Sequence, residues 1–211
     1  MIDYYERQST LSIYPPTKAV VVGVGGVGAW VALELALIGT ETIYLIDDDD
    51  VEATNLNRTP FTVAQIGQSK VSAVAELINE RRVECNVIAF QCRAEALPPD
   101  ELDMLRDANL FDCRDSVAPL DLPGTIRCGI VGGYDGTSVT IHTNPSEDTV
   151  FGANNVVRYR TVPSFVGAPA LIAAIIVNYF CLHQMIPEGE RIVTFDLKNI
   201  VDILTRGNLN E

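Results

Sequence analysis

Positive charge and histidine are scarce in this sequence. Its 211 residues carry 15 Lys and Arg against 28 Asp and Glu, a formal net charge of −13, and only two histidines. Proteins that bind a nucleic-acid backbone need basic patches that neutralise phosphates. We therefore expect no nucleic-acid partner. His142 and His183 fall in a predicted strand and a predicted helix, where packing is a commoner role than catalysis.

Closely spaced cysteines are also missing. The five cysteines form an odd set without a C-x-x-C pair: Cys85, Cys92, Cys113, Cys128 and Cys181. Structural zinc sites and disulfide frameworks need paired or close spacings, so we expect reduced thiols and no structural zinc. The first twelve residues include Asp3, Glu6 and Arg7 and show no apolar signal segment. Both observations favour a cytoplasmic protein.

One uncharged stretch, residues 161–186, approaches the roughly 20 apolar residues that a bilayer crossing needs. Pro163 and Asn178 interrupt it, and the strand-like segment 191–198 that follows needs a sheet partner. We therefore expect a helix over 167–186 that is buried in the core or at a subunit contact. A membrane span is the less favoured interpretation.

What the sequence does contain is an alternation of β-like and helical segments. With 47% hydrophobic and 20% charged residues, the chain can build one large core. The spacing of apolar residues predicts helices over 26–38, 69–82 and 98–106, and strands over 18–22, 42–46, 87–90, 110–112 and 125–131. This order predicts an α/β fold with a Rossmann-like, doubly wound, mainly parallel sheet.

The second half of the chain changes pattern. Residues 138–143 alternate apolar and polar side chains after a glycine-rich turn at 132–136, which predicts an antiparallel strand. We expect antiparallel strands to extend the parallel sheet. Residues 1–211 are thus interpreted as a single domain, with an N-terminal arm (1–17) and a long surface loop (144–161).

A glycine motif follows the first predicted strand. Gly23, Gly25, Gly26 and Gly28 lie between that strand and a helix, and Asp47 ends the next strand. Such glycines allow close approach of phosphates to the helix N-terminus, and a carboxylate at the second strand end accepts ribose hydroxyls. The motif predicts a nucleotide site but does not separate a dinucleotide from ATP.

The residues downstream favour ATP. Asp49, Asn55, Arg58 and Lys70 follow the second strand. An enzyme that displaces pyrophosphate must offset charge on the β- and γ-phosphates, and an arginine and a lysine suit that task. A hydride-transfer enzyme would have no need for these two cations near the phosphates.

Several motifs together resemble the ThiF/MoeB-type adenylyltransferases, a family that shares its fold with ubiquitin-activating enzymes. They occur in the family's order and near its spacings. The matching residues are the glycine loop with its extra Gly26, Asp47 and Asp49, Asn55 to Arg58, the Gly-Gln-x-Lys motif ending at Lys70, and Asp112 to Asp115.

The resemblance implies that residues 1–211 form a single ATP-binding adenylation domain, with ATP and Mg²⁺ as ligands. In the family's terms Gly25 and Gly26 would lie against the phosphates, Asp47 would bind the ribose and Asp115 would hold Mg²⁺. Arg7 matches an N-terminal arginine that reaches the γ-phosphate, often from the neighbouring subunit of a dimer. The other implied contacts to the triphosphate come from Asp49, Asn55, Arg58 and Lys70. Of these residues, Arg58, Lys70, Asp115 and Arg7 would take part in catalysis.

The implied reaction is the attack of a carboxylate on the α-phosphorus of ATP, which gives an acyl adenylate and pyrophosphate. The carboxylate would be the C-terminus of a small ubiquitin-like or sulfur-carrier protein, or of a peptide, and the enzyme would be a homodimer. Family members that act on modified tRNA are disfavoured here by the net charge of −13. Two alternatives stay open: a non-catalytic partner subunit of a heterodimeric activating enzyme, and an NAD-dependent oxidoreductase.

Overall fold

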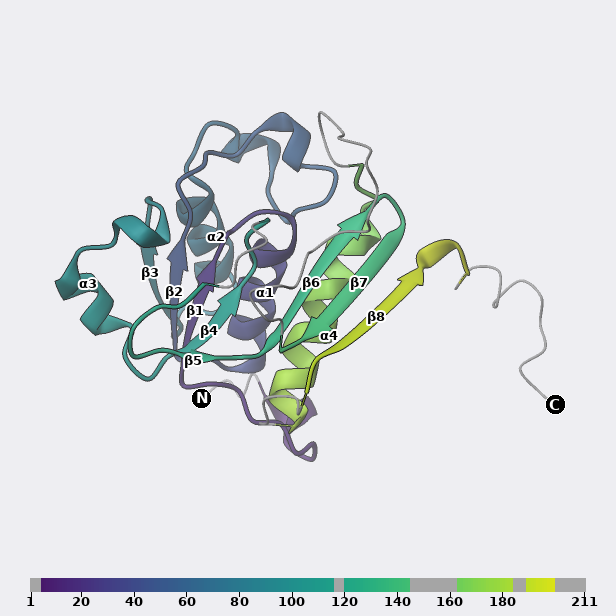
Figure 1. Cartoon of the computed structure of the whole chain (residues 1–211). Helices are drawn as coiled ribbons and strands as arrows, with labels where there is room; N and C mark the ends of the chain where they lie inside the picture. The colour runs from purple at the N-terminus through teal and green to yellow at the C-terminus, as the bar shows by residue number, and fades with distance from the viewer. Residues whose placement is uncertain (1–4, 116–119, 145–162, 184–188, 200–211) are drawn as a thin grey trace.

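The structure is a computed structural model that describes residues 5–115, 120–144, 163–183 and 189–199 (Figure 1). One sheet is parallel, in the order β3-β2-β1-β4-β5, and a second is antiparallel, in the order β6-β7-β8. The strands are β1 (Lys18–Val22), β2 (Thr42–Ile46), β3 (Asn86–Phe90), β4 (Asn109–Asp112), β5 (Ile126–Arg127), β6 (Ile130–Asp135), β7 (Ser138–Thr143) and β8 (Arg191–Asp196). The predicted fold class, a Rossmann-like α/β fold with a mainly parallel sheet and antiparallel strands, is confirmed. The antiparallel strands do not extend the parallel sheet, however, because β6, β7 and β8 form a sheet of their own.

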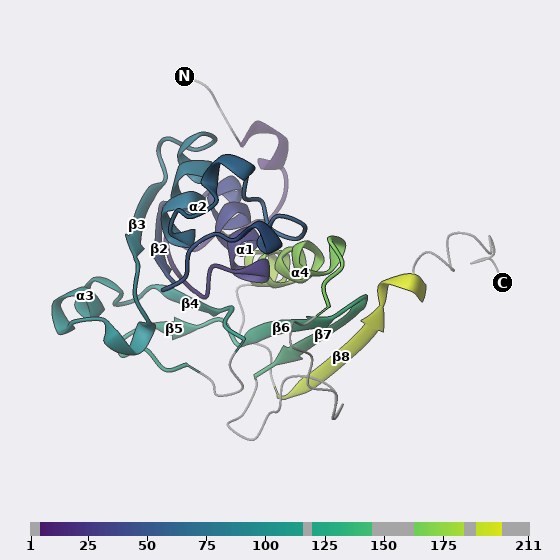
Figure 2. The same cartoon turned by 90° about the horizontal axis from the view of Figure 1, so that it is seen from above.

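Helices cover both faces of the parallel sheet. The α-helices are α1 (Gly26–Ile38), α2 (Lys70–Asn79), α3 (Pro99–Met104) and α4 (Gly167–His183), and the 3₁₀ turns are η1 (Glu6–Gln8), η2 (Ala53–Asn55), η3 (Val63–Gln65) and η4 (Ala94–Ala96). Figure 2 shows α1 and α2 on one face and α3 on the other. Val21 and Leu45 pack on the α1 side, whereas Val20 and Ile46 pack with Leu105 on the α3 side. A sheet covered on both faces requires such uninterrupted apolar strands.

The segment 125–131, predicted as one strand, is divided between the two sheets. β5 pairs with β4, whereas β6 pairs with β7. Gly129 lies between them with φ of 67°, a conformation that glycine adopts at little steric cost. The prediction of a turn over 132–136 is wrong, because residues up to Asp135 pair with β7 and the chain reverses at Gly136 and Thr137.

The uncharged helix predicted near the end of the chain is present as α4. It packs against α1 and against the antiparallel sheet, and Ile172, Ile176 and Cys181 are buried there. Contacts within the chain thus account for much of its apolar composition. None of the described helices is long and apolar enough to cross a bilayer. The loop predicted over 144–161 lies, except for Asn144, outside the described residues.

Glu34 is the one charged residue of α1, and burial raises its pKa from 4.5 to about 7. Between those two values the folded chain holds a proton that the unfolded chain has released. Stability is therefore lost as the pH rises through about 7.

We expect Glu34→Gln to remove this dependence. The variant should be more stable than the wild type at pH 8, by on the order of 1 kcal/mol after allowance for the solvated part of the side chain. Denaturant unfolding at pH 5 and pH 8 measures the difference. If the unfolding free energies of the two proteins differ by the same amount at pH 5 and at pH 8, the raised pKa of Glu34 is contradicted.

Candidate active site

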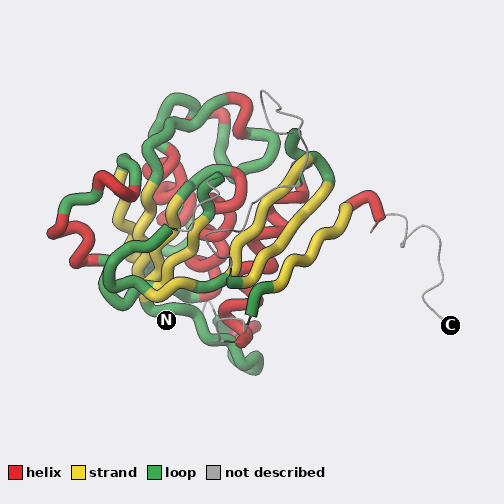
Figure 3. The backbone as a smooth tube through the Cα atoms, in the orientation of Figure 1, coloured by secondary structure: helices red, strands yellow, loops and turns green. Residues whose placement is uncertain are grey.

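The predicted site residues of the first two strands meet at one edge of the parallel sheet. β1 ends at Val22, β2 at Ile46 and β4 at Asp112, and the three strands are neighbours. The chain leaves β1 toward β2 on one side and returns to β4 on the other, which makes this edge the topological switch point. Figure 3 shows loops gathered above these strand ends.

The glycines of the first loop serve two different purposes. A Cβ on Gly28 would lie 1.8 Å from the carbonyl oxygen of Gly23, and a Cβ on Gly23, whose φ is 82°, would lie 2.8 Å from the backbone nitrogen of Arg114. These two glycines are required by packing. Gly25 differs, because no atom of the described residues lies within 4 Å of the place that its Cβ would take, and it directly precedes α1. The open space at Gly25 leaves room for a ligand.

This difference predicts different outcomes for two alanine substitutions. Gly28→Ala should destabilise the fold by about 3 kcal/mol or more, because backbone must move. Gly25→Ala should destabilise the fold less, because its Cβ meets no described atom within 4 Å and the cost comes only from a ψ of −140° that alanine disfavours; it should bind ATP at least about tenfold more weakly. Thermal unfolding and ATP titration of both variants measure this. A Gly25→Ala protein with normal ATP affinity would argue against phosphates at this loop.

Asp47 joins the end of β2 to the glycine loop. Its Oδ2 accepts a hydrogen bond from the Val24 N–H at 2.6 Å, and its Oδ1 accepts one from the Asp49 N–H at 2.9 Å. Burial raises the pKa of this carboxyl, whereas the two N–H groups and Lys70 lower it. Each oxygen keeps a further lone pair, so Asp47 can still accept hydrogen bonds from ribose hydroxyls.

Lys70 brings positive charge to the same place. Its Nζ lies 2.6 Å from Asp49 Oδ2 and 4.0 Å from Asp47 Oδ1, and the side chain is only 11% exposed. The Lys70 N–H also donates to the Asp49 carbonyl at 3.0 Å, which fixes the start of α2. The structure therefore brings Asp47, Asp49 and Lys70 together. Carboxylate oxygens of Asp47, Asp48 and Asp49 lie within 4.8 Å of one another.

Arg58 lies in the loop between β2 and α2 and is anchored to α1. Trp30 Nε1 donates to the Arg58 carbonyl at 3.0 Å, and Arg58 Nη1 donates to the Thr54 carbonyl at 2.5 Å. The Arg58 Nε is shielded from solvent, with no hydrogen-bond partner found in the described part of the chain. Asn55 is buried, and its Oδ1 accepts the Glu52 N–H at 3.0 Å, so its visible role is to shape the loop.

The end of β4 carries Asp115, which is exposed. The turn before it is held by an ion pair: Arg114 Nε lies 2.9 Å from Asp112 Oδ1, and Arg114 Nη1 lies 3.1 Å from Glu95. Arg114 was not among the predicted site residues, and its only signal in the sequence was its place inside the motif Asp112 to Asp115, which reads Asp-Cys-Arg-Asp. Burial raises the pKa of the Cys113 thiol in the same motif well above its usual value, which agrees with a packing role.

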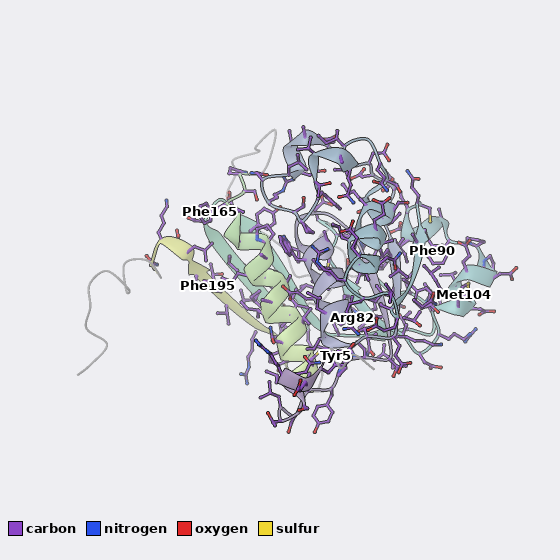
Figure 4. All side chains as sticks on the ribbon, turned by 180° about the vertical axis from the view of Figure 1, so that it is seen from behind. Tyr5, Arg82, Phe90, Met104, Phe165 and Phe195 are labelled. Atoms are coloured by element: carbon purple, nitrogen blue, oxygen red, sulfur yellow. The ribbon has the colours of Figure 1, made fainter. Side chains whose placement is uncertain are left out.

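Arg7 is the one candidate that the chain does not bring to this edge. It lies in η1, which is fastened to the opposite end of α1: Gln8 Nε2 donates to the Ile38 carbonyl at 3.0 Å, and the Arg82 guanidinium lies 4.4 Å from the Tyr5 ring centroid. Figure 4 shows Tyr5 and Arg82 near one end of α4 and Phe165 near the other. The 13 residues of α1 separate Arg7 from the glycine loop by about 20 Å.

Residues 15–206 match the model of the ThiF family. The chain belongs to the ThiF family. The resemblance drawn from the sequence motifs is thereby confirmed.

Individual relatives match shorter stretches. The NEDD8-activating enzyme E1 catalytic subunit of Caenorhabditis elegans is 41% identical over 80 residues, which is 37% of this chain and 19% of that protein. The tRNA threonylcarbamoyladenosine dehydratase of Escherichia coli is 34% identical over 116 residues, 53% of this chain and 42% of that protein. The chain thus matches less than half of the length of each. The crystal structure of E. coli MccB with ATP shares the fold, with a TM-score of 0.54, 19% identity, and coverage of 85% of this chain and 63% of that one.

Proposed function

We propose that this chain is an ATP-dependent adenylyltransferase that activates a carboxylate as an acyl adenylate. The observation that carries the proposal is the continuous set of contacts from Val24 in the glycine loop through Asp47 to Lys70. It joins a loop with room for phosphates, a carboxylate suited to ribose and a cation suited to phosphate charge. Membership of the ThiF family and the ATP named with MccB support it.

The proposed reaction needs positive charge more than it needs a base. A carboxylate is already ionised at neutral pH, so no proton has to be removed before it attacks the α-phosphorus. The bond from the α-phosphorus to the bridging oxygen breaks, and pyrophosphate leaves with the electron pair. Lys70 and Arg58 would reduce the repulsion between the two anions and offset the charge on the leaving group. The Arg58 Nε, which is shielded from solvent and has no partner among the described residues, would become a donor for a phosphate oxygen once the side chain turned toward it.

The carboxylates at this edge fit Mg²⁺, which prefers oxygen ligands. We propose Asp115 as its ligand, because this exposed carboxylate follows β4 at the same edge as the glycine loop. Asp112 is less suited, because Arg114 and the Leu120 N–H already occupy its oxygens. The ion would supply further positive charge to the phosphates when it is bound.

We propose a protein or peptide C-terminus as the activated carboxylate. The relatives named for NEDD8 activation support this class of substrate. A second candidate is a carboxylate on modified tRNA, because the chain is 34% identical to a tRNA threonylcarbamoyladenosine dehydratase over 116 residues. The net charge of −13 disfavours the second candidate.

A homodimer is part of the proposal, because the arm holds Arg7 far from the site of its own chain. If Arg7 contacts the γ-phosphate, it has to do so in the site of a second copy. A cytoplasmic setting suits the ATP requirement.

Isotope exchange between pyrophosphate and ATP tests the proposed reaction directly. We expect exchange that depends on Mg²⁺ and on a peptide or small carrier protein with a C-terminal carboxylate, and no exchange with tRNA. A nicotinamide absorbance change without any exchange would instead support the oxidoreductase alternative. ATP binding without exchange by any carboxylate would support a non-catalytic partner subunit.

A further inference from the structure

Tyr134 reaches the glycine loop from the antiparallel sheet. A Cβ built on Gly26 would lie 2.7 Å from the Tyr134 hydroxyl oxygen and 3.6 Å from Pro169 Cβ. Gly26 is the first residue of α1, and Pro169 lies in the first turn of α4. The Tyr134 hydroxyl therefore stands where the N-terminal turns of two helices meet, beside the loop assigned to phosphates.

The position of Tyr134 is fixed by close packing of β6 on α4. A Cβ on Gly132 would lie 2.3 Å from Ile172 Cγ2, so the absence of a side chain at this position lets the helix lie directly on the strand. Tyr134 follows two residues later on the same face of β6, and its ring packs against the core formed with α1 and α4. The packing of β6 against α1 and α4 thus fixes the position of the Tyr134 hydroxyl.

Within the described part of the chain, the Tyr134 hydroxyl has unused hydrogen-bonding capacity. Tyr134 is half-buried, and no hydrogen bond to its hydroxyl is found among residues 5–115, 120–144, 163–183 and 189–199. The N–H groups of the first turn of α1 also lack partners within the helix, and they favour negative charge nearby. An anion bound at Gly26 would lie within reach of both kinds of donor.

We propose that Tyr134 is a phosphate-binding residue of this site: its hydroxyl donates a hydrogen bond to a phosphate of ATP held beside Gly26. The inference rests on the proposed function, since it assumes that the glycine loop binds ATP. It adds a substrate contact from the antiparallel sheet, which neither the glycine motif nor the residues between β2 and α2 supply. The absence of a side chain at Gly26 would then serve two purposes: it leaves room for the phosphate and for the Tyr134 hydroxyl.

Tyr134→Phe tests this contact, because it removes the hydroxyl and keeps the ring. A hydrogen bond to a charged group predicts ATP affinity about 10- to 100-fold weaker with Mg²⁺ present. Adenosine, which has no phosphate, should bind the variant and the wild type equally. Calorimetry measures the dissociation constant for ATP, and ligand-observed NMR measures the one for adenosine. Thermal unfolding shows whether the variant keeps its fold.

Tyr44→Phe is the matched control. Tyr44 lies on the opposite face of the parallel sheet, stacked on Phe90 with ring centroids 6.5 Å apart, and its loss of a hydroxyl should leave ATP affinity unchanged. Wild-type ATP affinity in Tyr134→Phe, or an equal loss for adenosine, would overturn the inference. Failure of the wild type itself to bind ATP would instead remove the proposed function.

Discussion

Lys70→Ala is expected to lower pyrophosphate exchange by on the order of 100-fold or more while the protein stays folded. The reason is its position: the ammonium group is 2.6 Å from Asp49 and 4.0 Å from Asp47, at the edge where the glycine loop opens. Without it, the carboxylates would repel the triphosphate. Exchange rates at saturating ATP, compared with the wild type, measure the loss.

Lys18→Ala is the control for charge alone. Lys18 is exposed and begins β1, at the opposite edge of the same sheet. The Lys18→Ala substitution changes the net charge by the same amount as Lys70→Ala, so the variant should catalyse exchange at the wild-type rate. Near-normal exchange in Lys70→Ala would remove the assignment of this lysine, and equal losses in both variants would show a general effect of charge.

A mixture of two inactive variants is expected to regain activity if Arg7 acts between subunits. In a heterodimer of Arg7→Ala and Lys70→Ala chains, one site has an intact Lys70 and receives Arg7 from the other chain. Random pairing of equal amounts gives such a dimer half of the time, so about a quarter of the sites should work. The exchange rate of the mixed and reassembled protein, against each variant alone, measures this.

An arginine that acts within its own chain predicts no recovery in that mixture. The anchoring of the arm disfavours such a role. Arg82 is buried and donates to the carbonyls of Ala36 and Leu37 at the end of α1, and its guanidinium also contacts the Tyr5 ring. A mixture as inactive as its components, from a protein shown to exchange subunits, would refute the role of Arg7 between subunits.

The fold and the grouping of residues at the candidate site could be predicted because their signals are local. The apolar runs of β1 and β2, the glycine loop and Asp47 lie within 30 residues, and a βαβ unit has few ways to pack. The division of 125–131 between two sheets could not be foreseen, because it depends on the backbone of one residue, Gly129. Sequence spacing carries no signal for such a change of direction.

The contacts that the sequence analysis missed depend on residues far apart in the chain. Tyr134 is more than 100 positions from Gly26, and Trp30 meets the Arg58 carbonyl only after the loop beyond β2 folds back on α1. Arg7 shows the converse: its short motif match was visible, but its distance from the site follows only from how Tyr5 and Gln8 dock. Motifs identify residue types, and tertiary packing decides their neighbours.

The hydrogen bond from the Val24 N–H to Asp47 Oδ2, 2.6 Å long, ties the glycine loop to the end of β2. The conformation of the loop is therefore set by contacts within the chain itself, so this backbone has less freedom to lose when a ligand is held beside it.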